Sequence, residues 1–170
     1  MGLPVRDRAT LAHRYTLHHA LGERRHGQAW LAEDGVADRV VELLALEDRF
    51  RSLRALTLLV ELIDRPQLQH VGIAGLHELC FDDDARPHLV STPGNGEWLD
   101  DRLRREPAGR WLASRALVLE VGEALAHAHD RGWVHGGLSP AAITIEAGDP
   151  RRPRLKIHDF GLAPIADAID

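Results

Sequence analysis

Four short segments hold the residues whose types and spacing could perform chemistry. In chain order they cover residues 21–27, 40–42, 135–142 and 159–161. Glycines such as Gly22 and Gly27 let a turn approach a ligand closely, and carboxylates such as Glu42 and Asp159 can bind a cation. Taken singly, each segment is a weak signal, because glycine pairs are common in turns and an Asp-Phe-Gly tripeptide occurs by chance.

The elements that must position these segments follow from the spacing of apolar residues. The first half predicts three antiparallel strands, a helix and two further strands, over 15–20, 29–32, 40–46, 48–62, 73–81 and 88–90. In the helix, the predicted apolar face carries Leu53, Leu56, Val60 and Ile63. The second half predicts a linker, two helices, a loop and two strands, over 93–96, 98–105, 111–131, 133–142, 143–145 and 154–158.

In this order, and with these elements between them, the four segments resemble the protein kinase family, in particular bacterial serine/threonine kinases of the eukaryotic type. Residues 68–73 are similar to its Leu-x-His-Pro-x-Ile stretch, and residues 125–140 to the helix and catalytic-loop entry. The resemblance implies an α+β, bilobal fold: an antiparallel five-stranded N-lobe with one helix, and the first part of a helical C-lobe. The expected boundaries are an extension over 1–14, the N-lobe over 15–92, a linker over 93–97 and a partial C-lobe over 98–170.

The first departure from the family concerns charge. Glu42 stands where the resemblance places the third-strand lysine, and a glutamate reverses a lysine-phosphate attraction of about 4 kcal/mol at 4 Å and an effective dielectric near 20. Of the 21 basic residues, only Lys156 is a lysine, and it lies too late in the chain to take that position. The sequence therefore predicts that the lysine is missing.

The catalytic loop departs from the family as well. Gly137 occupies the position of the proton-accepting aspartate, Ser139 that of the loop lysine, and Ala142 that of the metal-binding asparagine. A glycine cannot accept a proton and an alanine cannot bind a metal. Of the charged groups, the resemblance leaves Glu61, expected to pair with the missing lysine, and Asp159, expected to bind metal.

The expected nucleotide pocket is altered in the same way. Gly22 and Gly27 remain, but Arg24 replaces the second glycine of the phosphate loop. Val40 is larger than the alanine that packs on adenine, and Thr144 puts a polar group under the base. The family uses ATP and magnesium, and these changes predict weak or absent ATP binding.

Arg24 has two interpretations. In one, its guanidinium folds into the pocket and contacts phosphate or the carboxylates of Glu42, Glu61 and Asp159, which would otherwise repel one another. In the other, which we expect, Arg24 is an exposed loop arginine screened by solvent.

Composition limits the other classes of function. The chain has 170 residues, a net charge of −5 and one cysteine, so the totals do not suggest a nucleic-acid-binding face and exclude an internal disulfide framework. The most apolar segment, 55–63, is far shorter than a membrane span, and no secretory signal is evident. We expect a cytoplasmic protein without a membrane partner.

The hypothesis from sequence is a truncated pseudokinase, a binding or regulatory module without phosphotransfer. The alternatives are a serine/threonine kinase with displaced catalytic groups, and a partial gene product without independent function. Because little resembling a C-lobe follows residue 161, the helix over 111–131 should expose apolar surface, which predicts a protein partner.

Overall fold

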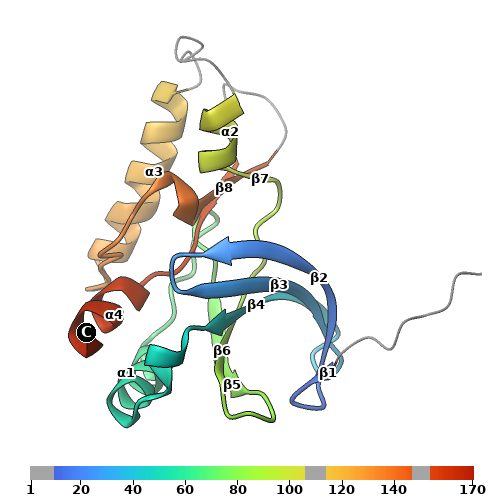
Figure 1. Ribbon diagram of the computed structural model, residues 1–170. Helices are drawn as coiled ribbons and strands as arrows, with labels where there is room; N and C mark the ends of the chain where they lie inside the picture. The colour runs from blue at the N-terminus through green and yellow to red at the C-terminus, as the bar shows by residue number, and fades with distance from the viewer. Residues whose placement is uncertain (1–9, 106–113, 147–153) are drawn as a thin grey trace, which may run out of the picture.

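The computed structural model describes residues 10–105, 114–146 and 154–170. A six-stranded antiparallel sheet curls over one side of the molecule (Figure 1) in the order β1-β2-β3-β4-β6-β5. Its strands are β1 (Thr10–Leu11), β2 (Tyr15–Arg24), β3 (Gly27–Asp34), β4 (Arg39–Leu46), β5 (Leu76–Phe81) and β6 (Pro87–Ser91). The sequence predicted five of these strands; the sixth, β1, pairs with β2 from within the predicted extension.

A smaller sheet and three helices form the other side of the molecule. The sheet is antiparallel, in the order β7 (Glu97–Trp98), β8 (Ile143–Ile145) and β9 (Leu155–Ile157). The helices are α2 (Leu99–Arg105), α3 (Ser114–His129) and α4 (Leu162–Ile169). Trp98, predicted to begin a helix, therefore lies in a strand. The strand predicted from Ile73 begins at Leu76, while Ile73 itself forms one isolated parallel bridge with Ile157.

Helix α1 (Leu53–Asp64) packs beneath the large sheet and differs from its prediction. It begins after Ser52, whose Oγ accepts a hydrogen bond from the Ala55 N–H at 3.2 Å, a typical N-cap; residues 48–51 form a 3₁₀ turn instead. The buried face is Ala55, Leu59 and Leu62, whereas Leu53 is 82% exposed. Apolar residues surround most of this helix, so periodicity alone could not select the buried face.

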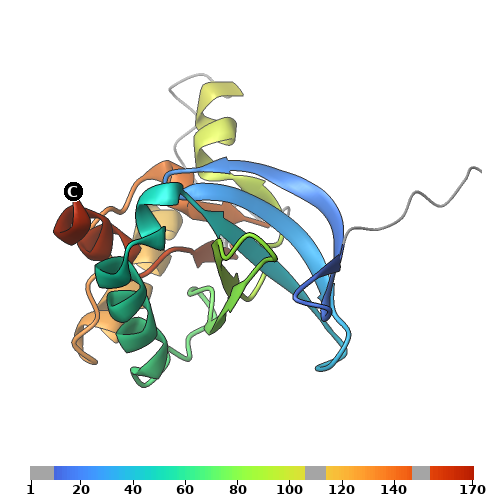
Figure 2. The same cartoon turned by 60° about the horizontal axis from the view of Figure 1, so that its bottom comes forward.

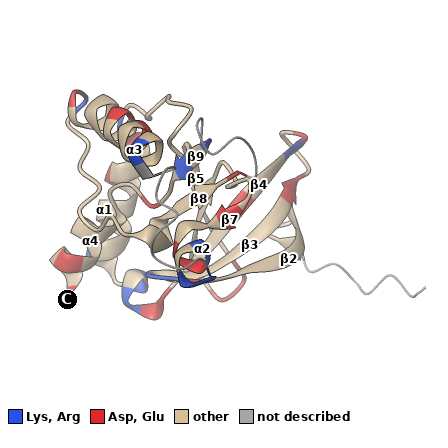
Figure 3. Cartoon of the chain, turned by 90° about the horizontal axis from the view of Figure 1, so that it is seen from above, with Lys and Arg blue, Asp and Glu red and all other residues tan. Residues whose placement is uncertain are grey.

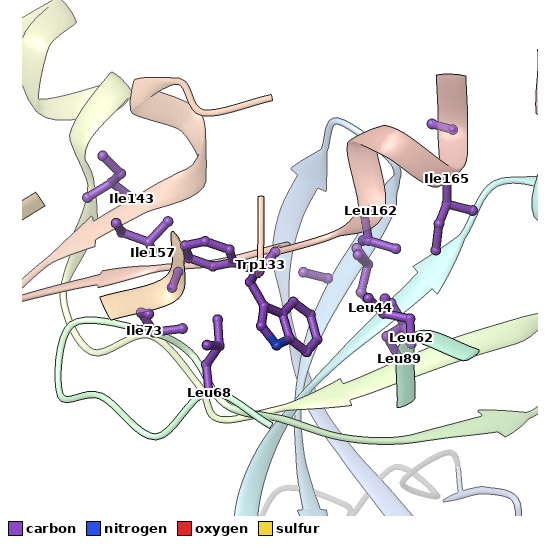
Figure 4. Packing of buried hydrophobic residues seen from close by; sticks show 14 of the residues in the cluster. Leu44, Leu62, Leu68, Ile73, Leu89, Trp133, Ile143, Ile157, Leu162 and Ile165 are labelled. Atoms are coloured by element: carbon purple, nitrogen blue, oxygen red, sulfur yellow. The ribbon is translucent and has the colours of Figure 1, made fainter. Parts of the chain in front are cut away.

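The main core lies where α1 meets the second half of the chain. Figure 4 shows Trp133 amid aliphatic side chains from both sides, among them Leu62, Leu68 and Leu162. The Trp133 indole N–H donates to the Pro66 carbonyl at 3.2 Å, which satisfies its one polar atom. Figure 2 shows α4 beside α1, so the core joins the large sheet to the chain's last helix.

The two faces of strand β4 pack into different parts of the protein. Val41 and Leu43 pack with Tyr15 and Val90 in a separate outer core, while Leu44 joins the main core. Because side chains alternate along a strand, Glu42 shares the inner face with Leu44. The fold thus aims a carboxylate into the protein between the two sheets.

None of the helices within the described ranges is long and apolar enough to cross a membrane.

Candidate nucleotide cleft

Glu42 is a buried carboxyl group in the cleft between the sheets, with 3% of its surface exposed. The main-chain N–H of Gly94 donates to its carboxylate, and among the residues described here Oε2 has no hydrogen-bond partner. Burial raises the pKa of Glu42 to about 7, the nearby Asp159 raises it too, and the Arg24 charge partly offsets them. At neutral pH this carboxyl group is therefore near its titration midpoint.

Arg24 folds into the cleft, contrary to the expectation of an exposed loop arginine. Its guanidinium carbon lies 3.4 Å from the centroid of the Trp98 ring, and its Nε and Nη2 are buried and have no hydrogen-bond partner within the described part of the chain. Burial lowers its pKa, while the charges of Glu42 and Asp159 raise it. A stacking surface in the small sheet, which the sequence did not reveal, makes the inward position favourable.

Thr144 lies at the floor of the cleft and is already paired within the protein. Its hydroxyl is 3.0 Å from Nε2 of His158, and both side chains are buried. The linker passes directly over this pair, because a Cβ added to Gly94 would lie 2.6 Å from the Thr144 Oγ1. Main chain of the linker thus covers the residue predicted to lie beneath a base.

His158 completes the group. Its Nδ1 is 3.9 Å from the Glu42 Oε1 and makes no hydrogen bond with a described residue, and its ring lies 4.9 Å from the Trp98 ring. Burial, assisted by the Arg24 charge, lowers its pKa to about 3. The imidazole is neutral at physiological pH, so it cannot form an ion pair with Glu42.

Asp159 approaches from the end of β9 in a left-handed backbone conformation, with φ of 61°. Burial raises the pKa of Asp159 to about 6, and Arg24 is the charge that opposes this rise. No group of three or more histidine, cysteine or acidic side chains in the described ranges is arranged to hold a metal ion. Asp159 alone retains the residue type that the family uses for metal.

The remaining residues predicted to line the nucleotide pocket do not all lie in the cleft. Glu61 is exposed on α1, because the helix buries the Leu59 and Leu62 side instead, and it is not among the charges that shift the pKa of Glu42 or Asp159. Val40 is 52% exposed, two residues from Glu42 on the same face of β4. The three-carboxylate cluster considered from sequence is thus reduced to Glu42 and Asp159.

The backbone conformation and packing of the β2–β3 turn account for two glycines of the first segment. Gly22 has φ of +107°, and open space surrounds its Cβ position. Gly27 lies against the main chain of β4, where a Cβ would collide with the Ala45 carbonyl. Both glycines are therefore explained by backbone geometry.

The loop over 135–142 lies together with Asp159. Gly137, Ser139, Ala142 and Asp159 line one cavity. The Arg25 guanidinium occupies the space that a side chain at Gly137 would enter, and the Ser139 hydroxyl caps no helix. Arg25 was not predicted as a site residue; the available signal was two adjacent arginines in a short turn and two adjacent glycines in the facing loop.

Comparison with known proteins agrees with this architecture. No family model matches the chain. The serine/threonine-protein kinase PknA of Mycobacterium tuberculosis is 33% identical over 173 residues, which cover 94% of this chain and 37% of PknA. The DNA damage-responsive serine/threonine-protein kinase RqkA of Deinococcus radiodurans is 29% identical, covering 97% of this chain and 24% of RqkA.

The solved structures agree on the fold. The kinase domain of Mycobacterium tuberculosis PknI superposes with a TM-score of 0.72 at 24% identity, covering 94% of this chain and 64% of that domain. The chain is a protein-kinase-like domain. It is related to bacterial serine/threonine kinases and spans little more than a third of the length of PknA.

The kinase-like cleft contains three residues that sequence reasoning missed as site members: Gly94, Trp98 and His158. The sequence analysis treated Gly94 as part of a linker and His158 as the end of a strand. A histidine directly before Asp159 was the one available signal, because alternation along β9 turns it toward the inner face.

Proposed function

We propose that this chain is a catalytically inactive protein-kinase-like domain, a pseudokinase, that acts as a binding or regulatory module with weak or no ATP binding. The observation that carries the proposal is the state of Glu42. A carboxyl group replaces the family's ATP-contacting lysine, is 3% exposed, and accepts a hydrogen bond from the linker at Gly94. Phosphoryl transfer depends on positive charge at the phosphates, and this position supplies none.

The packing of the cleft supports the same proposal. Arg24 lies on Trp98, and Gly94 lies over the Thr144–His158 pair. A base entering between the lobes would have to separate these contacts. With Gly137 and Ala142 in the loop, the described residues also provide neither a proton acceptor nor a second metal ligand at the family's positions.

The first experiment is a thermal-shift titration of the purified chain with ATP and MgCl₂, with the PknA kinase domain as positive control. We expect one cooperative unfolding transition whose midpoint ATP leaves unchanged. A clear ATP-dependent rise would contradict weak or absent binding. Unfolding without any cooperative transition would favour the third hypothesis, a partial gene product.

The second experiment is incubation with γ-³²P-ATP, magnesium and a generic protein substrate. We expect no label in the chain or the substrate. Arg24 inside the cleft is the observation that favours the alternative, an active kinase with a surrogate cation. Labelling that disappears in both Asp159→Ala and Arg24→Ala would establish that alternative and overturn the pseudokinase proposal.

A further inference from the structure

A second pocket lies beside the filled cleft, over the loop that follows α3. Its lining comes from the β2–β3 turn, the loop and the start of α4, and includes Arg25, His26, His135, Gly137, Ser139 and Asp159. In an active relative, the family resemblance would place the proton-accepting aspartate here, at the position of Gly137. In this chain the same place holds a cation.

Arg25 is that cation. A Cβ built on Gly137 would collide with the Arg25 Nη1 and would lie 2.8 Å from the Ala163 Cβ, so the guanidinium occupies the room that the missing side chain vacates. Arg25 is exposed, and within the described ranges it makes no hydrogen bond or ion pair. Many other arginines are paired, for example Arg14 with Asp34 and Arg49 with Asp170.

The groups around Arg25 add further hydrogen-bond donors. Arg49 donates to the Nδ1 of His26 at 3.3 Å, which leaves the proton of this imidazole on Nε2. Burial and the charges of Arg25 and Arg49 lower the pKa of His26 to about 4, so the ring is neutral. Ser139 contributes an exposed hydroxyl. His135 is a buried, neutral ring whose Nδ1 accepts from the Gly137 N–H at 3.3 Å.

One negative group lines the pocket, the carboxyl of Asp159, and it lies on the inner side near Arg24. Figure 3 shows basic and acidic residues interspersed over the elements, so no broad basic face distinguishes this region. What distinguishes it is an unpaired guanidinium beside a hydroxyl and an imidazole. A guanidinium fork of this kind matches the oxygens of a phosphate monoester, often through two parallel hydrogen bonds.

We propose that this pocket binds a phosphate monoester through Arg25, with Ser139 as a supporting donor. The site thus recognises the chemical group that its catalytic relatives would produce, and the inference rests on the proposed function, because a phosphotransferase would need an acid at Gly137. The phosphate could belong to a phosphorylated serine in a protein or to a free phosphate compound, and the experiment separates these sources.

The test is a fluorescence-anisotropy titration, without ATP, of the full chain with a labelled peptide containing one phosphoserine among glycines and alanines. The matched unphosphorylated peptide is the first control. We expect binding of the phosphopeptide only, and a loss of about 10- to 100-fold in Arg25→Ala, the usual effect of removing a charge-assisted hydrogen bond. Ser139→Ala should lose less.

Arg54→Ala is the matched control variant, because Arg54 is an exposed arginine on α1 and should leave binding unchanged. Arg25→Glu provides a second variant, with binding expected to fall below detection. Circular dichroism checks that each variant folds. Competition by inorganic phosphate at the phosphopeptide's own affinity would identify a free-phosphate site, and competition only at much higher concentration would identify a phosphoprotein site.

Absence of phosphopeptide and phosphate binding at millimolar concentration, or equal binding by Arg25→Ala, would overturn the inference. Because the titration contains no nucleotide, its result is independent of the labelling experiment. Transfer of label from ATP would refute the pseudokinase proposal even where the phosphopeptide binds.

Discussion

Two buried carboxylates, Asp34 at the end of β3 and Glu42 in the middle of β4, have opposite surroundings. Asp34 receives two hydrogen bonds of 2.7 Å from the Arg14 guanidinium and two more from the main-chain N–H groups of Val36 and Ala37. These bonds, led by Arg14, hold the pKa of Asp34 far below its ordinary value. Glu42 has one main-chain donor and a raised pKa.

The difference separates a carboxylate whose oxygens are fully hydrogen-bonded from one with few donors. Around Asp34 each lone pair has a donor, and Arg14 also contacts Glu78, which accepts from the Tyr15 hydroxyl at 2.6 Å. Around Glu42 the positive group, Arg24, lies on an aromatic ring and forms no ion pair with any residue that the structure describes. A buried acid without sufficient donors destabilises the fold, so the cleft is the less stable of the two regions.

The largest expected effect is on the Asp34 side. Asp34→Ala leaves the Arg14 guanidinium and two main-chain donors without their acceptor, and should lower the free energy of unfolding by about 3–5 kcal/mol. Urea denaturation at pH 7 measures the change. Asp83→Ala, in the exposed turn after β5, is the control and should stay within about 0.5 kcal/mol. A loss below about 1 kcal/mol for Asp34→Ala would contradict the stabilising role assigned to the Asp34 hydrogen bonds.

Glu42→Gln should act in the opposite direction. The pKa of Glu42 rises from 4.5 in the unfolded chain to about 7 in the fold, so its destabilising effect is absent below pH 4.5, grows up to pH 7 and is then constant. At pH 8 the glutamine variant should be more stable by on the order of 2–3 kcal/mol. Unfolding curves at pH 4.5 and pH 8 test this, and an equal difference at both pH values would contradict it.

Arg24→Ala removes the stack on Trp98 and the cation nearest to Glu42 and Asp159. We expect a loss of about 1 kcal/mol at pH 7, and a larger loss at pH 8.5, where both carboxyl groups are ionised. In the Glu42→Gln background the loss should shrink, because one of the two charges is gone. Equal losses in both backgrounds would show that Arg24 acts through packing alone.

The smallest effect is expected for Arg39→Ala. The Arg39 Nε lies 3.4 Å from the Asp34 Oδ2, and its side chain is 37% exposed. Because the contact is long and the Arg39 side chain reaches solvent, the pair should contribute less than about 1 kcal/mol and weaken with salt. Urea denaturation without added salt should show a small loss in the free energy of unfolding. In roughly 0.5 M NaCl, which screens exposed charges, this loss should disappear. A larger, salt-independent loss would make Arg39 a full member of the Asp34 network.

The order of the four segments was sufficient to predict the fold, because each lies at a junction whose position the strands and helices determine. The positions of individual side chains were harder to predict from the sequence than the fold. The exposed position of Glu61 depends on which face of α1 is buried, and apolar residues at 53, 56, 58, 59, 60, 62 and 63 leave several choices. Arg24 was expected in solvent because its partner, Trp98, is 74 residues away in the sequence.

The two buried acids show the same limit. Asp34 lies in an Asp-Gly turn signal, and nothing local indicates that Arg14 reaches it. Glu42 was identified by a substitution against the family pattern, and its missing lysine was predictable from composition. Its hydrogen bond to Gly94 was not, because that contact depends on how closely the linker approaches the floor of the cleft.

The contact between Gly161 and Leu62 has a mechanical consequence. A Cβ on Gly161 would lie 2.5 Å from the Leu62 Cδ1, so the turn that carries Asp159 rests directly on α1. The two Arg49–Asp170 hydrogen bonds, of 2.9 and 3.0 Å, connect the 3₁₀ turn that precedes α1 to the end of α4. Helix α1 and the Asp159 turn are therefore in direct packing contact. Displacing α1 would disturb the support of this turn, which links the position of the helix to that of the Asp159 carboxyl group.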